Sequence, residues 1–179
     1  MAVKHFEEAF QYVRFSEGLN RSSIRYGDRL KTYGQLDWLP TKSKDVVIGY
    51  QKRGSGQGME LGFYIFFHDK CVGQVAFDYR DAPRELMRLF KGRKLAVPHV
   101  GVLPELRGLG YPSAIYGLAL KKGTVLVSDH HTVAASTLWE AVARKFKAHL
   151  EYATQDDDTG KWRLVPKEMT HDDWKVMYL

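Results

Sequence analysis

The sequence predicts a mixed α/β domain, in which a mixed sheet carries helices on its faces. Two features of the pattern support this: short runs rich in β-branched and aromatic residues separated by turn residues, and two apolar helical segments that alternate with strands in the second half. The length of 179 residues suits a single domain, and 44% hydrophobic with 27% charged residues is the balance of a globular chain.

The N-terminal part, residues 1–44, is predicted to be an addition to a core that spans residues 45–179. A helix is expected over residues 5–19, where Phe6, Phe10 and Val13 recur at helical spacing. Residues 20–40 mix basic and aromatic side chains, a composition that suits nucleic-acid stacking. A solvated loop and short helix whose aromatic residues pack on the core is the favoured interpretation.

The middle of the chain predicts a β meander. Runs rich in Val, Ile, Phe and Tyr indicate strands over residues 45–50, 59–67 and 72–79. The turn His68–Lys70 makes a hairpin of the last two, and the glycine-rich stretch 52–58 is expected to be a hairpin loop. A helical insertion follows over residues 83–90, with Pro83 in its first turn and with a core-facing side formed by Leu86, Leu89 and Phe90.

The second half alternates strands and helices. A strand over residues 94–103 is interrupted by Pro98, which predicts an edge, a bulge or a splayed end. The remaining elements are expected to be a helix at 113–122, a strand at 124–127, a helix at 133–146 and a hairpin of 150–153 with 162–165. Leu138, Val142 and Phe146 are predicted to form the buried side of the second helix.

Composition excludes several classes of protein. The single cysteine, Cys71, rules out an intramolecular disulfide and a cysteine-cluster zinc site, and no metal site is predicted. No apolar run approaches the roughly 20 residues that span a bilayer, and Glu7 and Glu8 stand where a signal peptide needs apolar residues, so a cytoplasmic location is expected. The net charge of +6 favours anionic partners, which include nucleic acid, a nucleotide cofactor and an acidic protein surface.

The junction Arg107-Gly108-Leu109-Gly110, between a strand and a helix, carries the clearest chemical signal. Glycines allow a tight turn, and the N–H groups and dipole of the following helix favour an anion. A Walker A loop is excluded because no Gly-Lys-Ser/Thr follows, and a dinucleotide loop lacks its third glycine, where Ser113 stands. An ordinary tight turn uses the same glycines, so the pair alone does not decide the function.

The stretch from His99 to Arg144 resembles the Gcn5-related N-acetyltransferase (GNAT) superfamily, and in particular its bacteriophage-encoded members. The cofactor loop of that family reads Q/R-x-x-G-x-G/A, and Arg107, Gly110 and Pro112 stand at those positions. Ser128-Asp129, followed by residues 135–142, looks like the approach to the second cofactor-side helix. The resemblance implies a mostly antiparallel central sheet with a splayed parallel strand pair and flanking helices.

The resemblance also implies acetyl-CoA as cofactor and acetyl transfer to a primary amine of a protein, a nucleic acid or a small molecule. The backbone N–H groups of Val100 and Val102 are expected to polarise the thioester carbonyl. His99 is the first candidate for the general base, and Asp129 and Ser136 are the other catalytic candidates. The residues expected to bind the pyrophosphate are Arg107, Gly108, Leu109, Gly110, Tyr111, Ser113 and Ala114.

Two positions depart from the family pattern. Pro112 stands where the family prefers Gly or Ala and removes one N–H, and Trp139 stands where many members carry the tyrosine that protonates the leaving thiolate. The alternative function is therefore a catalytically inactive GNAT-fold binding protein, in the host cytoplasm or associated with a virion. Such a protein would engage a host protein or nucleic acid through its basic N-terminal third, with Arg21, Arg25, Arg29, Lys52 and Arg53.

Overall fold

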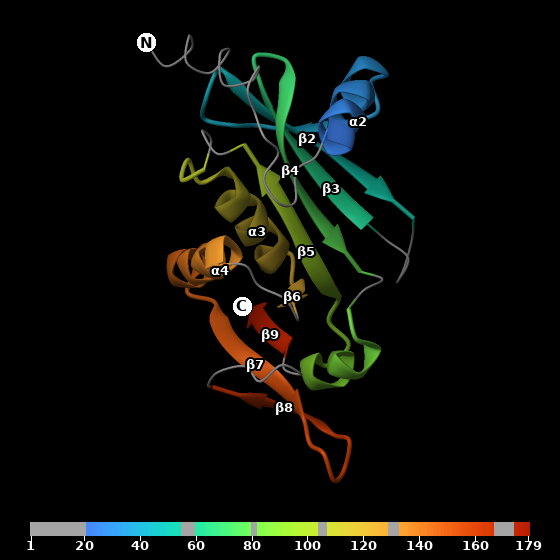
Figure 1. The fold of residues 1–179 in the computed structure, drawn as a ribbon, viewed down its shortest axis with the longest axis vertical. Coiled ribbons are helices and arrows are strands. Elements are labelled where there is room, and N and C mark those ends of the chain that lie inside the picture. Colours follow the sequence, from blue (N-terminus) through green and yellow to red (C-terminus); the bar gives the residue numbers. More distant parts are fainter. Residues whose placement is uncertain (1–20, 55–59, 80–81, 104–106, 129–132, 167–173) are drawn as a thin grey trace. The chain divides into compact units, whose positions relative to one another are not determined.

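The computed structural model describes residues 21–54, 60–79, 82–103, 107–128, 133–166 and 174–179 (Figure 1). The helix predicted over residues 5–19 lies outside these ranges. The chain divides into two compact units. The first comprises Met1–Arg53, Leu61–Ala76 and His99–Tyr111, and the second comprises Gly54–Glu60, Phe77–Pro98 and Pro112–Leu179.

The first unit is built on helix α2 (Arg21–Thr32) and on strands in the order β1-β2-β3-β4. These strands are β1 (Asp37–Leu39), β2 (Val46–Arg53), β3 (Glu60–Phe67) and β4 (Lys70–Asp78). β1 pairs with β2 in antiparallel orientation, although no strand was predicted there. The hairpin predicted around residue 68 is confirmed: His68 and Asp69 both have positive φ, which a two-residue connection between twisted strands requires.

Helix α2 packs on β3 and β4 through a small apolar cluster, which consists of Leu30, Leu36, Tyr64, Phe66 and Cys71 with Tyr26 against it. The rings of Tyr26 and Tyr64 lie 6.2 Å apart, so one aromatic residue of the stretch 20–40 is fixed to the core as expected. The ring of Trp38, although 48% exposed, likewise lies 5.6 Å from that of the buried Phe66, whereas Tyr33 is 68% exposed. The helix itself is longer than the short one predicted.

The second unit contains a five-stranded arrangement in the order β5-β6-β9-β7-β8, to which β5 contributes its first half. β5 pairs with β6 in parallel, whereas β6 with β9, β9 with β7 and β7 with β8 are antiparallel. The elements are η2 (Arg84–Phe90), β5 (Leu95–Val102), α3 (Tyr111–Lys121), β6 (Val125–Ser128), α4 (Val133–Phe146), β7 (His149–Gln155), β8 (Trp162–Val165) and β9 (Trp174–Tyr178). The predicted fold class, a mixed and mostly antiparallel sheet with one parallel pair and helices, is confirmed.

Three details of the second unit differ from the predictions. η2 is a 3-10 helix with Pro83 at its N-cap rather than in its first turn, and Leu86 and Phe90 are its buried residues. β9 was not predicted, and it inserts between β6 and β7. The buried residues of α4 are Trp139, Val142 and Ala143, so Val142 of the predicted buried side is confirmed, whereas Leu138 and Phe146 are half-buried and the burial of Trp139 was not predicted.

The two helices of the second unit pack closely against each other, as Figure 1 shows. A Cβ at Gly117 of α3 would lie 2.1 Å from the Phe146 ring at the end of α4, so only glycine permits this contact. Tyr116, which precedes Gly117 on α3, meets Phe77 edge to face, with their ring centroids 5.7 Å apart. Within the described ranges, none of the helices combines the length and the apolar character needed to cross a bilayer.

Candidate functional site

The glycine loop ahead of α3 has the backbone conformation that its sequence predicts. Gly108 and Gly110 have φ values of +79° and +83°, where L side chains are strained, and a Cβ at either would meet nothing within 4 Å. Open space therefore lies beside the backbone at both positions. Arg107, which precedes them, is exposed and donates from Nε to the carbonyl oxygen of Val102 at 3.4 Å.

Helix α3 begins at Tyr111, directly after this loop, and has no acidic residue in its first turn. The first N–H groups of any helix lack an intrahelical acceptor, and the helix dipole adds partial positive charge there. Pro112 contributes no N–H, which leaves those of Tyr111, Ser113 and Ala114. Ser113 is buried and Ala114 is exposed. Within the described residues, the first turn of α3 offers an anion backbone donors and no competing carboxylate.

The parallel pair β5–β6 separates soon after it begins. Its register contains two positions, Leu95 with Val125 and Ala96 with Leu126. β5 then continues through Pro98, and β6 continues to Ser128 with pairs only to β9. Proline cannot donate a ladder hydrogen bond, so Pro98 accounts for the end of pairing on the β5 side.

The second half of β5 carries the proposed base and the proposed carbonyl-polarising amides. His99 is exposed, Val100 is half-buried and Val102 is 6% exposed. These three residues and the loop Arg107–Tyr111 all belong to the first unit. Leu103 N–H donates to the carbonyl of Val72 on β4 at 3.1 Å, which fixes the end of the strand.

The remaining catalytic candidates belong to the second unit. Ser136 lies half-buried in the first half of α4, while Asp129 lies outside the described residues. Trp139 is 2% exposed, and its indole N–H donates to the hydroxyl of Tyr116. That position therefore belongs to the core and offers no proton donor to a ligand.

The basic residues predicted to engage a partner have different surroundings. Arg25, Arg29 and Lys52 are exposed. Arg53 is held in place, with its guanidinium 4.3 Å from the centre of the Tyr26 ring and hydrogen-bonded to the Tyr64 hydroxyl at 3.3 Å. The side chain of Arg21 lies outside the described part.

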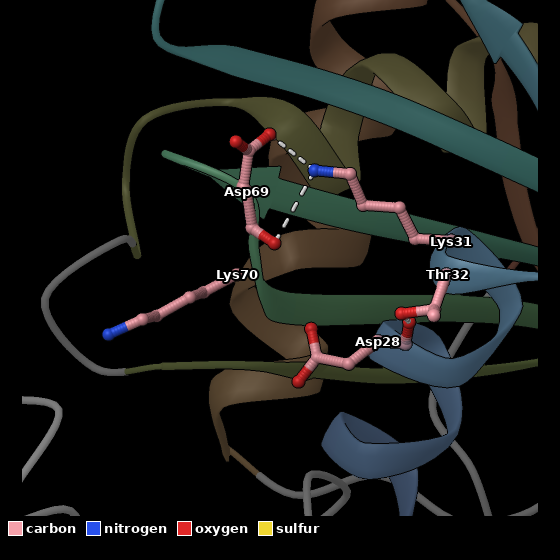
Figure 2. Close-up of a pocket in the computed structure, with 5 residues that line it drawn as sticks. All are labelled: Asp28, Lys31, Thr32, Asp69 and Lys70. Atoms are coloured by element: carbon pink, nitrogen blue, oxygen red, sulfur yellow. Dashed lines mark hydrogen bonds and ion pairs between the residues drawn. The ribbon is translucent and has the colours of Figure 1, made fainter.

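A hollow of about 380 Å³ in the first unit was not predicted from the sequence; its lining residues are Asp28, Lys31, Thr32, Asp69 and Lys70. Figure 2 shows Lys31 reaching from α2 to the carboxylate and carbonyl oxygen of Asp69 in the hairpin turn. Lys31 holds the pKa of Asp69 below its ordinary value, first through a hydrogen bond and then through its charge. The charges of the two carboxylates and the two amines that line the hollow cancel. Within the described ranges, no group of three or more side chains is placed to bind a metal ion.

Sequence reasoning also missed a buried lysine, Lys175 of β9, which is 4% exposed. Burial lowers its pKa, against the attraction of Glu140 on α4. No local signal in the sequence marks it, because its burial results from the insertion of β9 between β6 and β7.

No protein-family model matches the sequence, and no curated protein matches it significantly. Among solved structures, a spermidine N-acetyltransferase SpeG chimera from Vibrio cholerae and hSSAT is 16% identical, with a TM-score of 0.36 over 66% of this chain and 64% of that one. RimL, a ribosomal L7/L12 alpha-N-protein acetyltransferase in complex with coenzyme A, is 17% identical, with a TM-score of 0.36 over 66% and 60%. The apo form I crystal structure of RimL is 13% identical, with a TM-score of 0.43 over 79% of this chain and 93% of that one.

This chain thus spans less than two thirds of the length of the first two of these proteins. At such identities and TM-scores, the likenesses establish neither a family nor an activity for this chain.

Proposed function

We propose that this chain is an acetyl-CoA-dependent N-acetyltransferase of the Gcn5-related superfamily, acting on a primary amine of a protein, a nucleic acid or a small molecule. The observation that carries the proposal is the parallel pair β5–β6, whose register contains only two positions. A strand edge left free in this way can hold an extended arm such as pantetheine through backbone hydrogen bonds, as an added strand is held.

The residues that follow β5 fit a pyrophosphate. The open space beside Gly108 and Gly110 lets an anion approach the backbone closely. Leu109, between them, is 59% exposed, and its N–H is proposed as a further donor to the pyrophosphate. The N–H groups of Tyr111, Ser113 and Ala114 and the cationic side chain of Arg107 complete the proposed set.

Acetyl-CoA, when bound, supplies an activated acetyl group. The N–H groups of Val100 and Val102 are proposed to polarise its carbonyl, and preorganised backbone donors of this kind stabilise charge that develops on oxygen. An amine attacks only when it is neutral, so a base must take its proton. His99 is exposed on the same strand segment and is proposed to accept that proton.

Ser136 and Asp129 have supporting roles in the proposal. Ser136, half-buried on α4, is proposed to hydrogen-bond the pantetheine arm or to donate a proton. Asp129 follows β6 in the sequence and lies outside the residues that the structure describes. It is proposed as a further catalytic residue. Trp139, bonded to Tyr116 in the core, takes no part.

The binding-only alternative is favoured by one observation: the position at which many GNAT enzymes carry a tyrosine acid is here a core tryptophan. In that case the protein would engage a nucleic acid or a host protein through the exposed Arg25, Arg29 and Lys52. A nucleic-acid partner predicts an affinity that falls steeply with salt, because phosphate neutralisation releases counterions.

The test compares two glycines with the same conformation. Gly110→Ala and Gly92→Ala each place a Cβ at a φ near +80° in open space, so each should cost about 1–2 kcal/mol of stability. Only Gly110→Ala should weaken acetyl-CoA binding in calorimetry, by tenfold or more, because only that Cβ stands where the pyrophosphate is proposed to lie. Equal affinities in the two variants, or no binding by the unsubstituted protein, would overturn the proposal.

Catalysis is separated from binding by thiol release. With acetyl-CoA bound, free thiol should accumulate in the presence of an accepted amine, and His99→Gln should slow that release by about 10²-fold with unchanged acetyl-CoA affinity. Binding without thiol release across small amines, proteins and RNA would select the binding-only alternative.

A further inference from the structure

Helix α2 carries arginines at a regular spacing. Arg25 and Arg29 stand four residues apart on this helix, and Tyr33 follows at the same interval. The N–H of Tyr33 donates to the carbonyl oxygen of Arg29 at 2.9 Å, so the helical turn continues as far as the tyrosine. Residues four apart lie on one side of a helix, about 6 Å apart along its axis. Arg21, the first residue of α2, extends the same spacing by one turn.

The side chains of this row face water. Arg25 and Arg29 are exposed, and Tyr33 is 68% exposed. Another side of the helix carries Tyr26 and Leu30, which pack in the apolar cluster on β3 and β4. Arg25, Arg29 and Tyr33 therefore form a stripe outside the core, the α2 stripe.

The positive charge of the α2 stripe has no counter-charge within the described part of the chain. Neither Arg25 nor Arg29 forms an ion pair there. Asp28, the only acidic residue of α2, accepts the backbone N–H of Cys71 at 2.9 Å and is thereby directed to the β3–β4 hairpin. Like charges four residues apart repel each other and destabilise a helix. A pattern that costs helix stability calls for a partner that neutralises it.

The surrounding sequence favours a polyanion as that partner. Residues 21–53 contain eight basic and three acidic residues, which account for five of the six net positive charges of the chain. A concentration of positive charge attracts polyanions and speeds their association. Arginine suits phosphate in particular, because its planar guanidinium can present two N–H groups to one phosphate.

The exposed ring of Tyr33 distinguishes between kinds of polyanion. An unpaired base stacks on an aromatic side chain, and every base has a face that can do so. In a duplex these faces are covered by neighbouring base pairs. An acidic protein surface would use the two arginines but would leave the ring without a role. The row of two cations and one ring thus fits a single strand best.

We propose that the α2 stripe binds single-stranded nucleic acid, with phosphates on Arg25 and Arg29 and a base stacked on Tyr33. The contacts are with groups that every nucleotide carries, so binding tolerates changes of sequence. The inference goes beyond the proposed function, because it uses none of the residues proposed to hold acetyl-CoA and does not depend on acetyl transfer.

The experiment measures fluorescence anisotropy with labelled single strands of about 12 nucleotides over a range of salt concentrations. Arg25→Gln with Arg29→Gln should weaken binding about tenfold at low salt. The same pair should reduce the slope of log K against log salt by about 1.4, the value for two lost phosphate contacts. Arg84→Gln with Arg88→Gln is the matched control, since it removes two exposed arginines at the same spacing from η2 in the second unit. The control should leave affinity and slope close to those of the unsubstituted protein.

Substitutions of Tyr33 test the stacked base. Tyr33→Leu keeps an apolar side chain without an aromatic face, so it should weaken single-strand binding about tenfold. Tyr33→Phe keeps the ring and should retain the affinity. The RNA and DNA forms of the strand are compared, and tighter binding of either identifies the natural partner while supporting the stripe. A duplex of the same sequence should bind less tightly than the single strand.

Four results would overturn the proposal. One is the absence of single-strand binding at low salt, and another is an equal loss of affinity in the two arginine pairs, which would show a general effect of net charge. Tighter binding of poly-glutamate than of the strands would make an acidic protein the partner. A lowered thermal midpoint in Arg25→Gln with Arg29→Gln would assign the arginines to folding, because relief of their repulsion should leave that midpoint unchanged or raise it. Failure of acetyl-CoA to bind concerns the proposed function alone.

Discussion

The indole N–H of Trp139 donates to the hydroxyl of Tyr116, and the two rings meet edge to face with their centroids 6.4 Å apart. Trp139 is 2% exposed and Tyr116 1% exposed, so water does not replace this hydrogen bond. Burial raises the pKa of Tyr116, and the hydrogen bond from Trp139 opposes that shift without cancelling it. The pair fixes α3 to α4, and neither ring is available to donate a proton to a ligand.

Trp139→Phe should therefore cost stability without changing acetyl-CoA affinity. The substitution removes the donor and leaves a buried hydroxyl unpaired, which costs about 1–3 kcal/mol in addition to the loss of packed volume. Tyr116→Phe leaves the indole unpaired at a similar cost. In the double variant both partners of this hydrogen bond are gone, so neither is left buried without the other. Its loss of unfolding free energy in urea should therefore be smaller than the sum of the losses in the two single variants. Strict additivity would mean that the hydrogen bond contributes nothing.

The same pair shows where sequence reasoning succeeds and fails. The 3.6-residue period predicted α4 with its bounds, because the spacing of apolar residues is a local property. The buried side was predicted to carry Leu138, Val142 and Phe146; Val142 is buried, but the largest buried side chain of the helix, Trp139, was not predicted. The choice among overlapping apolar faces depends on the partner helix, and the hydroxyl of Tyr116 selects the face that carries the indole.

For the candidate site, the glycine loop and the splayed strand pair were predictable because each has a local cause. Gly108 and Gly110 supply the positive φ, and Pro98 ends the pairing. β1 has only three residues, too few to show an alternating pattern. Lys175 was not predictable, since its burial depends on β9 inserting between two strands that precede it in the chain.

Gly27→Ala should destabilise the first unit although alanine favours helices. A Cβ at this position of α2 would lie 2.6 Å from the buried Sγ of Cys71 and 3.1 Å from a ring carbon of Tyr64. The helix-propensity gain of about 1 kcal/mol is then outweighed by a steric cost of about 1–3 kcal/mol. Adding Cys71→Ala removes the sulfur and should recover part of the loss in urea unfolding. A stabilised single variant would show that α2 moves freely on the sheet.

The thiol of Cys71 should make stability fall as pH rises above 9. Burial raises its pKa from 9.0 to about 12, partly offset by a hydrogen bond with the backbone of Gly73. Between those values the unfolded chain has lost the proton that the folded chain keeps, so the free energy of unfolding decreases by up to about 1.4 kcal/mol per pH unit. Between pH 8 and about pH 10, the free energy of unfolding should fall further in the unsubstituted protein than in Cys71→Ala. The two proteins share all other titrating groups, so the difference reports on the thiol. Equal losses would contradict the prediction.

The two carboxylates of the hollow in Figure 2 should differ sharply in their contribution to stability. Asp28 accepts the backbone N–H of Cys71 at 2.9 Å, and Cys71 is fully buried, so Asp28→Ala leaves that donor unpaired at a cost of about 1–3 kcal/mol. The side chain of Asp69 is 89% exposed where it pairs with Lys31, and water solvates both partners once they separate. Asp69→Asn removes the charge while its side chain still suits the positive φ of this turn position, so it should leave the urea midpoint unchanged.

Salt provides the independent check on this difference. The lowered pKa of Asp69 depends on Lys31, and ions screen an exposed pair, so NMR titration at about 1 M salt should find that pKa returned towards its ordinary value. Because the folded pKa is depressed, the small stabilisation from this pair is present above the ordinary pKa and disappears as pH falls through the folded value. The loss in Asp28→Ala involves a buried amide and should be the same at both salt concentrations. If the loss of stability in Asp28→Ala depended on salt, the effect of Asp28 would come from its charge. The Lys31–Asp69 pair, and not the hydrogen bond of Asp28, would then be the contact that holds α2 to the hairpin.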